Sequence, residues 1–168
     1  MFFQTWGDTT AAMVDQGQAL RSIGGQVVVK VVATRAGLAA AALLARDDIP
    51  VLVTAVYNAG QALLAAAAHA QYVAPYVGKM TDANRDGVAE AITMATALAA
   101  VGGETRVLAA SLRSGVDVVR LAVAGIRDFA VSIAVAEMLL GDQLTDSAAA
   151  GFEDDIANLQ VLDGRIKA

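Results

Sequence analysis

A lysine interrupts the valine-rich stretch "QVVVKV", which spans Gln26–Val31. A β-branched run this apolar predicts a strand that is buried on both faces. Lysine is rarely buried unless another group pairs with it or a reaction uses it. Burial disfavours the charged ammonium, and a neutral amine is a nucleophile towards ketones and aldehydes. Lys30 is therefore the first candidate for chemistry, as a residue that could form a Schiff base with a carbonyl substrate.

Polar side chains also stand near the carboxyl ends of other predicted strands, so that the full set comprises Gln4, Lys30, Thr54, Tyr76 and Ser111. In a parallel βα barrel, these ends and the loops after them carry the active site. Taken singly, each residue is also compatible with a strand end that meets solvent. Together they favour a site in which either a side chain or a held water moves the protons of imine formation, a role that Tyr76 could fill with Gln4 and Thr54. The iminium is an electron sink, so a neighbouring carbon–carbon bond could break or form.

Six short apolar runs predict the strands, and longer alanine- and leucine-rich runs between them predict helices. The strands are expected at Phe2–Trp6, Gln26–Val31, Val51–Val56, Gln71–Val77, Arg106–Ser111 and Phe129–Ile133. This alternation predicts a parallel sheet with helices outside it, either an open doubly wound sheet or most of a (β/α)8 barrel. The glycine pairs of "SIGGQ" and "AVGGE" precede strands, which is the wrong side for cradling a dinucleotide phosphate. The barrel is therefore the favoured fold.

The composition narrows the function classes. The 168 residues predict a single domain over 1–168, with 142–168 as a C-terminal helical tail. A net charge of −5 without a basic patch argues against nucleic acid as a partner. The chain has no cysteine and one histidine, His69, which argues against disulfides, iron–sulfur clusters, zinc and a serine–histidine–aspartate triad. We therefore expect no metal and no cofactor.

A membrane span is the other alternative, because the mean hydropathy is +0.54 and residues 49–78 contain no Asp, Glu, Lys or Arg. The same stretch is interrupted by Pro50, Pro75 and the turn-like "YNAGQ". The first residues lack the basic-then-apolar pattern of a signal peptide. The sequence thus predicts a soluble cytoplasmic protein that does not associate with membranes, in which His69 ends a helix.

Several stretches resemble the fructose-6-phosphate aldolase and small transaldolase family of class I (Schiff-base) enzymes. They are "VVVKVVATRAGLAA", "IPVLVTAVYNAGQALLAAAAHAQYVAPYVGKM", "RVLAASLRS" and "AAGFEDDI", so the resemblance runs from Phe2 into the tail. The resemblance implies a (β/α)8 TIM-barrel fold that here lacks its first two βα units, leaving six units and a C-terminal helix. It also implies a homo-oligomer in which C-terminal helices pack across subunits.

The resemblance assigns catalytic roles to four residues. Lys30 matches the Schiff-base lysine, and Tyr76 matches the tyrosine that acts as acid and base. Gln4 and Thr54 match the pair that holds the catalytic water beside that tyrosine.

Three more residues match positions that bind the substrate. Ser111 and Lys79 match positions that meet the substrate phosphate, and Ala74 matches a small residue that lines the pocket. The family usually has arginine where Lys79 stands. A lysine keeps the charge but loses the bidentate fork.

The resemblance implies an aldolase or transaldolase that acts on a sugar phosphate, either fructose 6-phosphate or dihydroxyacetone with an aldehyde. True transaldolases of the family tend to carry glutamate and phenylalanine where Gln4 and Tyr76 stand, so the aldolase reaction is favoured. A second class of protein is the alternative, namely a catalytically inactive member of the family or an oligomeric scaffold with the same fold. A barrel without its first two units would have unpaired edges at Phe2–Trp6 and Phe129–Ile133.

Overall fold

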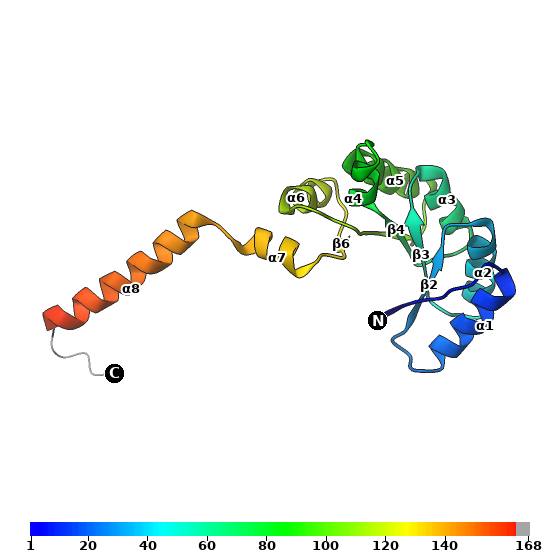
Figure 1. Ribbon diagram of the computed structural model, residues 1–168, viewed down its shortest axis with the longest axis horizontal. Helices are drawn as coiled ribbons and strands as arrows, with labels where there is room; N and C mark the ends of the chain where they lie inside the picture. The colour runs from blue at the N-terminus through cyan, green and yellow to red at the C-terminus, as the bar shows by residue number, and fades with distance from the viewer. Residues whose placement is uncertain (164–168) are drawn as a thin grey trace. The chain divides into compact units, whose positions relative to one another are not determined.

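The computed structural model describes residues 1–163, and the chain divides into two parts, Met1–Ser132 and Ile133–Ala168. The first part holds a six-stranded parallel sheet whose strand order, β1-β2-β3-β4-β5-β6, repeats the order of the chain (Figure 1). Its strands are β1 Phe2–Gln4, β2 Val28–Val32, β3 Val51–Val56, β4 Tyr72–Pro75, β5 Arg106–Ala109 and β6 Asp128–Phe129. A doubly wound sheet would reverse direction at a switch point. The unbroken order instead confirms the predicted barrel-type β/α fold.

Helices alternate with these strands. In the first part they are α1 Thr10–Arg21, α2 Arg35–Arg46, α3 Ala59–Ala67, α4 Val77–Asp82, α5 Gly87–Val101 and α6 Gly115–Val123. The second part comprises α7 Ile133–Leu140 and α8 Gln143–Asp163. The predicted tail over 142–168 is thus helical from Gln143 to Asp163, and its last residues, 164–168, lie outside the described part. None of the helices described is both long and apolar enough to span a membrane.

Polar residues mark where most helices begin. The side chains of five cap residues each accept a hydrogen bond from a backbone N–H in the first turn of the following helix, namely Thr9, Thr34, Asn58, Asp86 and Ser114. Such caps satisfy amide groups that the first turn leaves without intrahelical partners. Since Thr34 and Asn58 follow strands closely, α2 and α3 begin near the carboxyl ends of β2 and β3.

The two faces of the sheet differ in burial. On β2, Val29 and Val31 are fully buried, whereas Val28, Lys30 and Val32 are half-buried. The expectation that this valine run is buried on both faces is therefore wrong for one face. Only alternate residues pack against the helices, and the others lie on the face that would become the interior of a barrel.

A β-bulge interrupts β3 near its carboxyl end. Thr54 pairs with Ala74, but the next paired residues are Val56 and Pro75, so the register shifts between Thr54 and Val56. The additional residue, Ala55, adopts a φ of +55°, in the left-handed region that L-residues rarely occupy. The shift changes which later residues of β3 face the sheet interior.

Four predicted strands end earlier than expected. The strand predicted at Phe2–Trp6 stops at Gln4, and the one predicted at Arg106–Ser111 stops at Ala109. The strand predicted at Gln71–Val77 stops at Pro75, because Val77 begins the short helix α4. The strand predicted at Phe129–Ile133 is wrong beyond Phe129, since β6 comprises Asp128–Phe129 and Ile133 begins α7. A short apolar run does not by itself distinguish a strand from a buried helix start.

Candidate active site

A cavity of about 390 Å³ lies on the interior face of the sheet. It brings together five of the predicted site residues, and they come from strands β2, β3 and β4 and from the segments that follow β4 and β5. These residues are Lys30, Thr54, Ala74, Tyr76 and Ser111. The rest of the lining is mainly apolar and includes Phe2 and Leu52. The cavity therefore combines a primary amine with hydroxyl groups inside an apolar wall, which is typical of small-molecule sites.

Lys30 sits in the middle of β2, opposite Gln4 on one side and Leu52 on the other. Its backbone carbonyl accepts hydrogen bonds from the Thr5 amide at 2.9 Å, the Thr5 hydroxyl at 3.0 Å and the Gln4 amide at 3.2 Å. Within residues 1–163, no ion pair involves its ammonium group. The backbone is thus fixed tightly, while the side chain is available to the cavity.

Tyr76 and Thr54 form the polar pair of the cavity. The Thr54 hydroxyl donates to the Tyr76 hydroxyl at 3.1 Å, and Thr54 is only 1% exposed. Tyr76 follows β4 directly, and its amide donates to the Val56 carbonyl at 3.2 Å. One hydroxyl is buried and the other is half-buried, so the pair places a hydrogen-bonded donor and acceptor at the cavity wall.

Gln4 lies outside the cavity lining, although the resemblance pairs it with Thr54. Its side chain is exposed at the end of β1, where its amide donates to the Thr5 carbonyl at 2.8 Å and to the Lys30 carbonyl. The structure therefore places this amide against the backbone of the lysine strand. It brings Thr54 and Tyr76 together without Gln4.

The two predicted phosphate residues differ in their placement. Ser111 lines the cavity and has a φ of +58°. Its carbonyl accepts from the Gly78 amide at 2.9 Å, and a Cβ at Gly78 would stand only 2.2 Å from that oxygen. Lys79, the next residue of α4, is exposed and does not line the cavity. The close approach at Gly78 thus brings the backbone of α4 beside Ser111.

Two residues near this site were missed by the sequence reasoning. Arg113, two residues beyond Ser111, pairs with Asp82 of α4 at 3.0 Å. Tyr57 packs its ring edge-on against Tyr76, with ring centroids 6.1 Å apart and an interplanar angle of 77°. Strict strand alternation from Thr54 would place Tyr57 on the opposite face of the sheet. The bulge at Ala55 shifts the alternation by one residue and brings Tyr57 to the same face as Thr54.

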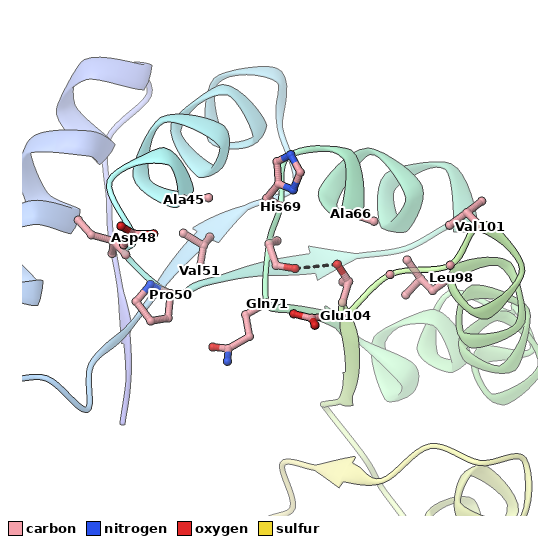
Figure 2. Close-up of a pocket in the computed structure, with 15 residues that line it drawn as sticks. Ala45, Asp48, Pro50, Val51, Ala66, His69, Gln71, Leu98, Val101 and Glu104 are labelled. Atoms are coloured by element: carbon pink, nitrogen blue, oxygen red, sulfur yellow. Dashed lines mark hydrogen bonds between the residues drawn. The ribbon is translucent and has the colours of Figure 1, made fainter.

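A larger cavity, of about 610 Å³, lies at the amino ends of β3, β4 and β5 (Figure 2). Asp48, His69, Gln71 and Glu104 lie around it, and none of the predicted site residues does. As predicted, His69 follows the end of α3, which stops at Ala67. Among the described residues, no cluster of three or more acidic or histidine side chains could hold a metal ion. Since barrel active sites lie at the opposite, carboxyl ends of the strands, the smaller cavity is the candidate active site.

The fold and the cavity define a barrel-type β/α protein with an amine-containing site at the carboxyl ends of its strands. Solved structures of mandelate oxidase variants share this fold, with TM-scores of 0.56 and 0.57 at 19% and 16% sequence identity. The alignments cover 77% of this chain and 47% and 49% of those chains, so the chain spans about half the length of the solved structures that it matches. Sequence identity this low carries the likeness of fold alone.

Residues 2–165 match the sequence model of the family described as Transaldolase/Fructose-6-phosphate aldolase, and the chain belongs to that family. A "Probable transaldolase" of Exiguobacterium sp. is 38% identical over 88% of this chain and 68% of its own length. A "Probable transaldolase" of Coprothermobacter proteolyticus is 37% identical over 91% of this chain and 69% of its own length. The resemblance noted in the sequence is therefore confirmed at the level of the family.

Proposed function

We propose that this chain is a Schiff-base aldolase or transaldolase that acts on sugar phosphates, with Lys30 as the nucleophile. The observation that carries the proposal is that the Lys30 side chain and the hydroxyl pair of Thr54 and Tyr76 line one cavity. Membership of the Transaldolase/Fructose-6-phosphate aldolase family supports chemistry at a carbon–carbon bond.

The proposed reaction begins when the Lys30 amine attacks the ketone carbon of the substrate. Tyr76, with Thr54 behind it, supplies the proton that lets the carbinolamine lose water and become a protonated imine. The same pair then takes the proton from the substrate hydroxyl beside the scissile bond. The bonding electrons move into the iminium, an aldehyde leaves, and an enamine of dihydroxyacetone stays attached to Lys30. Protonation and hydrolysis of that enamine complete an aldolase cycle. Addition of the enamine to a second aldehyde, followed by hydrolysis of the resulting imine, completes a transaldolase cycle.

The proposed phosphate contacts lie beyond the hydroxyl pair. The Ser111 hydroxyl would donate to a phosphate oxygen from the cavity wall, and the exposed Lys79 ammonium would attract the same group. Ala74 is 2% exposed and carries only a methyl group, which leaves room for the sugar beside Tyr76. The choice of aldolase over transaldolase rests on the identities of Gln4 and Tyr76.

Self-association is a further part of the proposal. Helix α8 exposes apolar side chains at several positions, with Leu144 at 80%, Phe152 at 68% and Ile156 at 53% exposure. Such side chains are compatible with a helix that packs against another copy of the chain.

A non-catalytic remnant or scaffold is the second candidate function. One observation favours it, namely the position of Gln4 outside the cavity.

Borohydride trapping separates the two candidates. The protein is incubated with dihydroxyacetone or fructose 6-phosphate and reduced, and the adduct is mapped by mass spectrometry. We expect an adduct on Lys30 that disappears in Lys30→Ala and, with dihydroxyacetone as the substrate, persists in the control Lys79→Ala. An unmodified Lys30 in folded protein would favour the non-catalytic candidate.

A further inference from the structure

We propose that Tyr57 is a positioning residue for Tyr76, turned towards the cavity by the bulge at Ala55. This inference rests on the proposed function for the assignment of Tyr76 as the proton-transfer residue. The evidence is the register of β3 and β4, the ring contact between the two tyrosines, and the hydrogen bonds that fix the backbone of Tyr57.

The register shows how Tyr57 reaches the cavity side. Ala74 and Tyr76 line the cavity, so Pro75 between them points to the helix side. Val56 pairs with Pro75, and paired residues on neighbouring strands point to the same side of a sheet, so Val56 points to the helix side as well. Tyr57, the next residue, therefore points to the same side as Tyr76.

Without the bulge, β3 would turn the other set of alternating residues towards the cavity after Thr54. Thr54 lines the cavity, so a regular strand would place Val56 on the cavity side and Tyr57 among the helices. The one extra residue, Ala55, puts Thr54 and Tyr57 on one side of the sheet although they are three positions apart. Its φ of +55° shows that a non-glycine residue is held in a rarely populated conformation at this point.

The two residues so presented contact different parts of Tyr76. Thr54 holds the phenol oxygen by the 3.1 Å hydrogen bond, and Tyr57 packs against the ring at a centroid distance of 6.1 Å. An edge-to-face contact restricts the tilt of an aromatic ring. Tyr57 therefore limits the orientations from which the Tyr76 hydroxyl can reach Thr54 and the substrate.

The backbone of Tyr57 is fixed from both sides. Its amide donates to the Gln61 side-chain oxygen at 2.8 Å, and its carbonyl accepts from the Arg85 guanidinium at 2.6 Å. The same guanidinium nitrogen pairs with Glu90 at 2.6 Å. These bonds connect Tyr57 to helices α3 and α5. They hold the backbone from which the Tyr57 ring projects, so the ring stays beside Tyr76.

The test uses a readout that does not require turnover. The chain has three tyrosines, Tyr57, Tyr72 and Tyr76, so their ring signals in tyrosine-labelled protein can be assigned by single Tyr→Phe substitutions. The measured quantity is the nuclear Overhauser effect between the Tyr76 ring and the Thr54 methyl group. We expect Tyr57→Phe to keep it, because the ring remains, and Tyr57→Leu to weaken it clearly.

Tyr72→Leu is the matched control, because Tyr72 lies earlier on the same strand as the Tyr76 segment and does not line the cavity. It should leave the Tyr76–Thr54 signal in place. Arg85→Gln gives a second route that keeps the Tyr57 side chain, and it should weaken the signal partially even if Tyr57→Leu does not fold. An unchanged signal in folded Tyr57→Leu, or in Arg85→Gln if the former does not fold, overturns the inference.

Trapping rates then connect the geometry to the reaction. We expect Tyr57→Leu to trap dihydroxyacetone on Lys30 roughly tenfold more slowly, with Tyr57→Phe within about twofold of the parent, as for a misplaced proton-transfer group. Equal rates in the parent and folded Tyr57→Leu would also contradict positioning. If the parent forms no adduct while the Overhauser pattern behaves as expected, the proposed function fails and the positioning of Tyr76 by Tyr57 stands.

Discussion

The hydroxyl oxygens of Thr54 and Tyr76 lie 3.1 Å apart, although 22 positions separate the two residues in the chain. Thr54 comes from β3, and Tyr76 follows the neighbouring strand β4. Parallel pairing of these strands brings their carboxyl ends to one edge of the sheet, and the two hydroxyl groups meet there. The bond is therefore a product of the sheet register.

Thr54→Val tests whether this bond matters for proton transfer. Valine keeps the branched shape but removes the hydroxyl, so the Tyr76 hydroxyl loses its buried partner. We expect the rate of Lys30 trapping to fall roughly tenfold, as for the partial loss of an acid–base group. The free energy of unfolding should change by about 1 kcal/mol. Thr54→Ser is the control, and equal rates in the valine and serine variants would contradict the role.

Lys79→Ala tests the proposed phosphate contact. Lys79 is exposed on α4 near Ser111 and does not line the cavity. Removal of the charge should raise KM for fructose 6-phosphate roughly tenfold and leave kcat unchanged, as expected for binding that is equal in ground and transition states. Trapping of unphosphorylated dihydroxyacetone should not change. Equal effects on both substrates would show that Lys79 acts through the fold.

Gly37→Ala tests how closely α2 packs on the lysine strand. A Cβ at this position would stand 1.9 Å from the carbonyl oxygen of Val32, the last residue of β2. Backbone must move to relieve that clash, so we expect a loss of about 2 kcal/mol in the free energy of unfolding, measured by urea titration. Gly151→Ala is the control, since no atom lies within 4 Å of the added methyl group. A free energy of unfolding equal to that of the parent would contradict the packing argument.

The pair of Arg106 and Asp128 offers a fourth test, because it connects β5 to the two-residue strand β6. The guanidinium contacts both carboxylate oxygens, at 2.9 and 2.5 Å, and it lies 5.4 Å from the centre of the Tyr72 ring. Arg106 is 53% exposed, so screening keeps the expected coupling to about 0.5–1 kcal/mol. A double-mutant cycle with Arg106→Met and Asp128→Asn measures it. The coupling should shrink in high salt, and a salt-independent value would contradict a screened ion pair.

The sequence predicts the parallel β/α fold well because its signals are local. The strand at Val51–Val56 has the predicted bounds, and the apolar periodicity that defines it needs no knowledge of distant residues. The end of the sheet was less predictable. Residues after Phe129 are as apolar as a strand, but pairing with β5 stops there and α7 begins at Ile133. Pairing is a long-range property that a short window does not contain.

In the candidate site as well, the sequence reveals the residues with a local signal and misses those whose position depends on long-range structure. Lys30, Thr54 and Tyr76 stand out as polar residues in apolar strands, and the cavity collects them. Tyr57 could not be found this way. A bulge changes the side of the sheet to which the later side chains point, and the sequence carries no clear signal of it. The Gln4 amide donates to backbone carbonyls, a partner choice that depends on the local geometry of β1 and β2.

The matching order of strands and chain has a consequence for how the sheet assembles. Among residues 1–163, each strand pairs only with strands that adjoin it in the sequence, so each of these pairings closes a loop of a single βα unit. Closing one βα unit costs less chain entropy than pairing strands from distant parts of the chain would, so neighbouring strands can pair one after another. Strand β3 is almost fully buried and pairs with β2 on one side and β4 on the other, so it takes part in two such closures. Lys30 and Thr54 lie on one of these neighbouring pairs, so the amine and the hydroxyl of the cavity come together when a single loop closes.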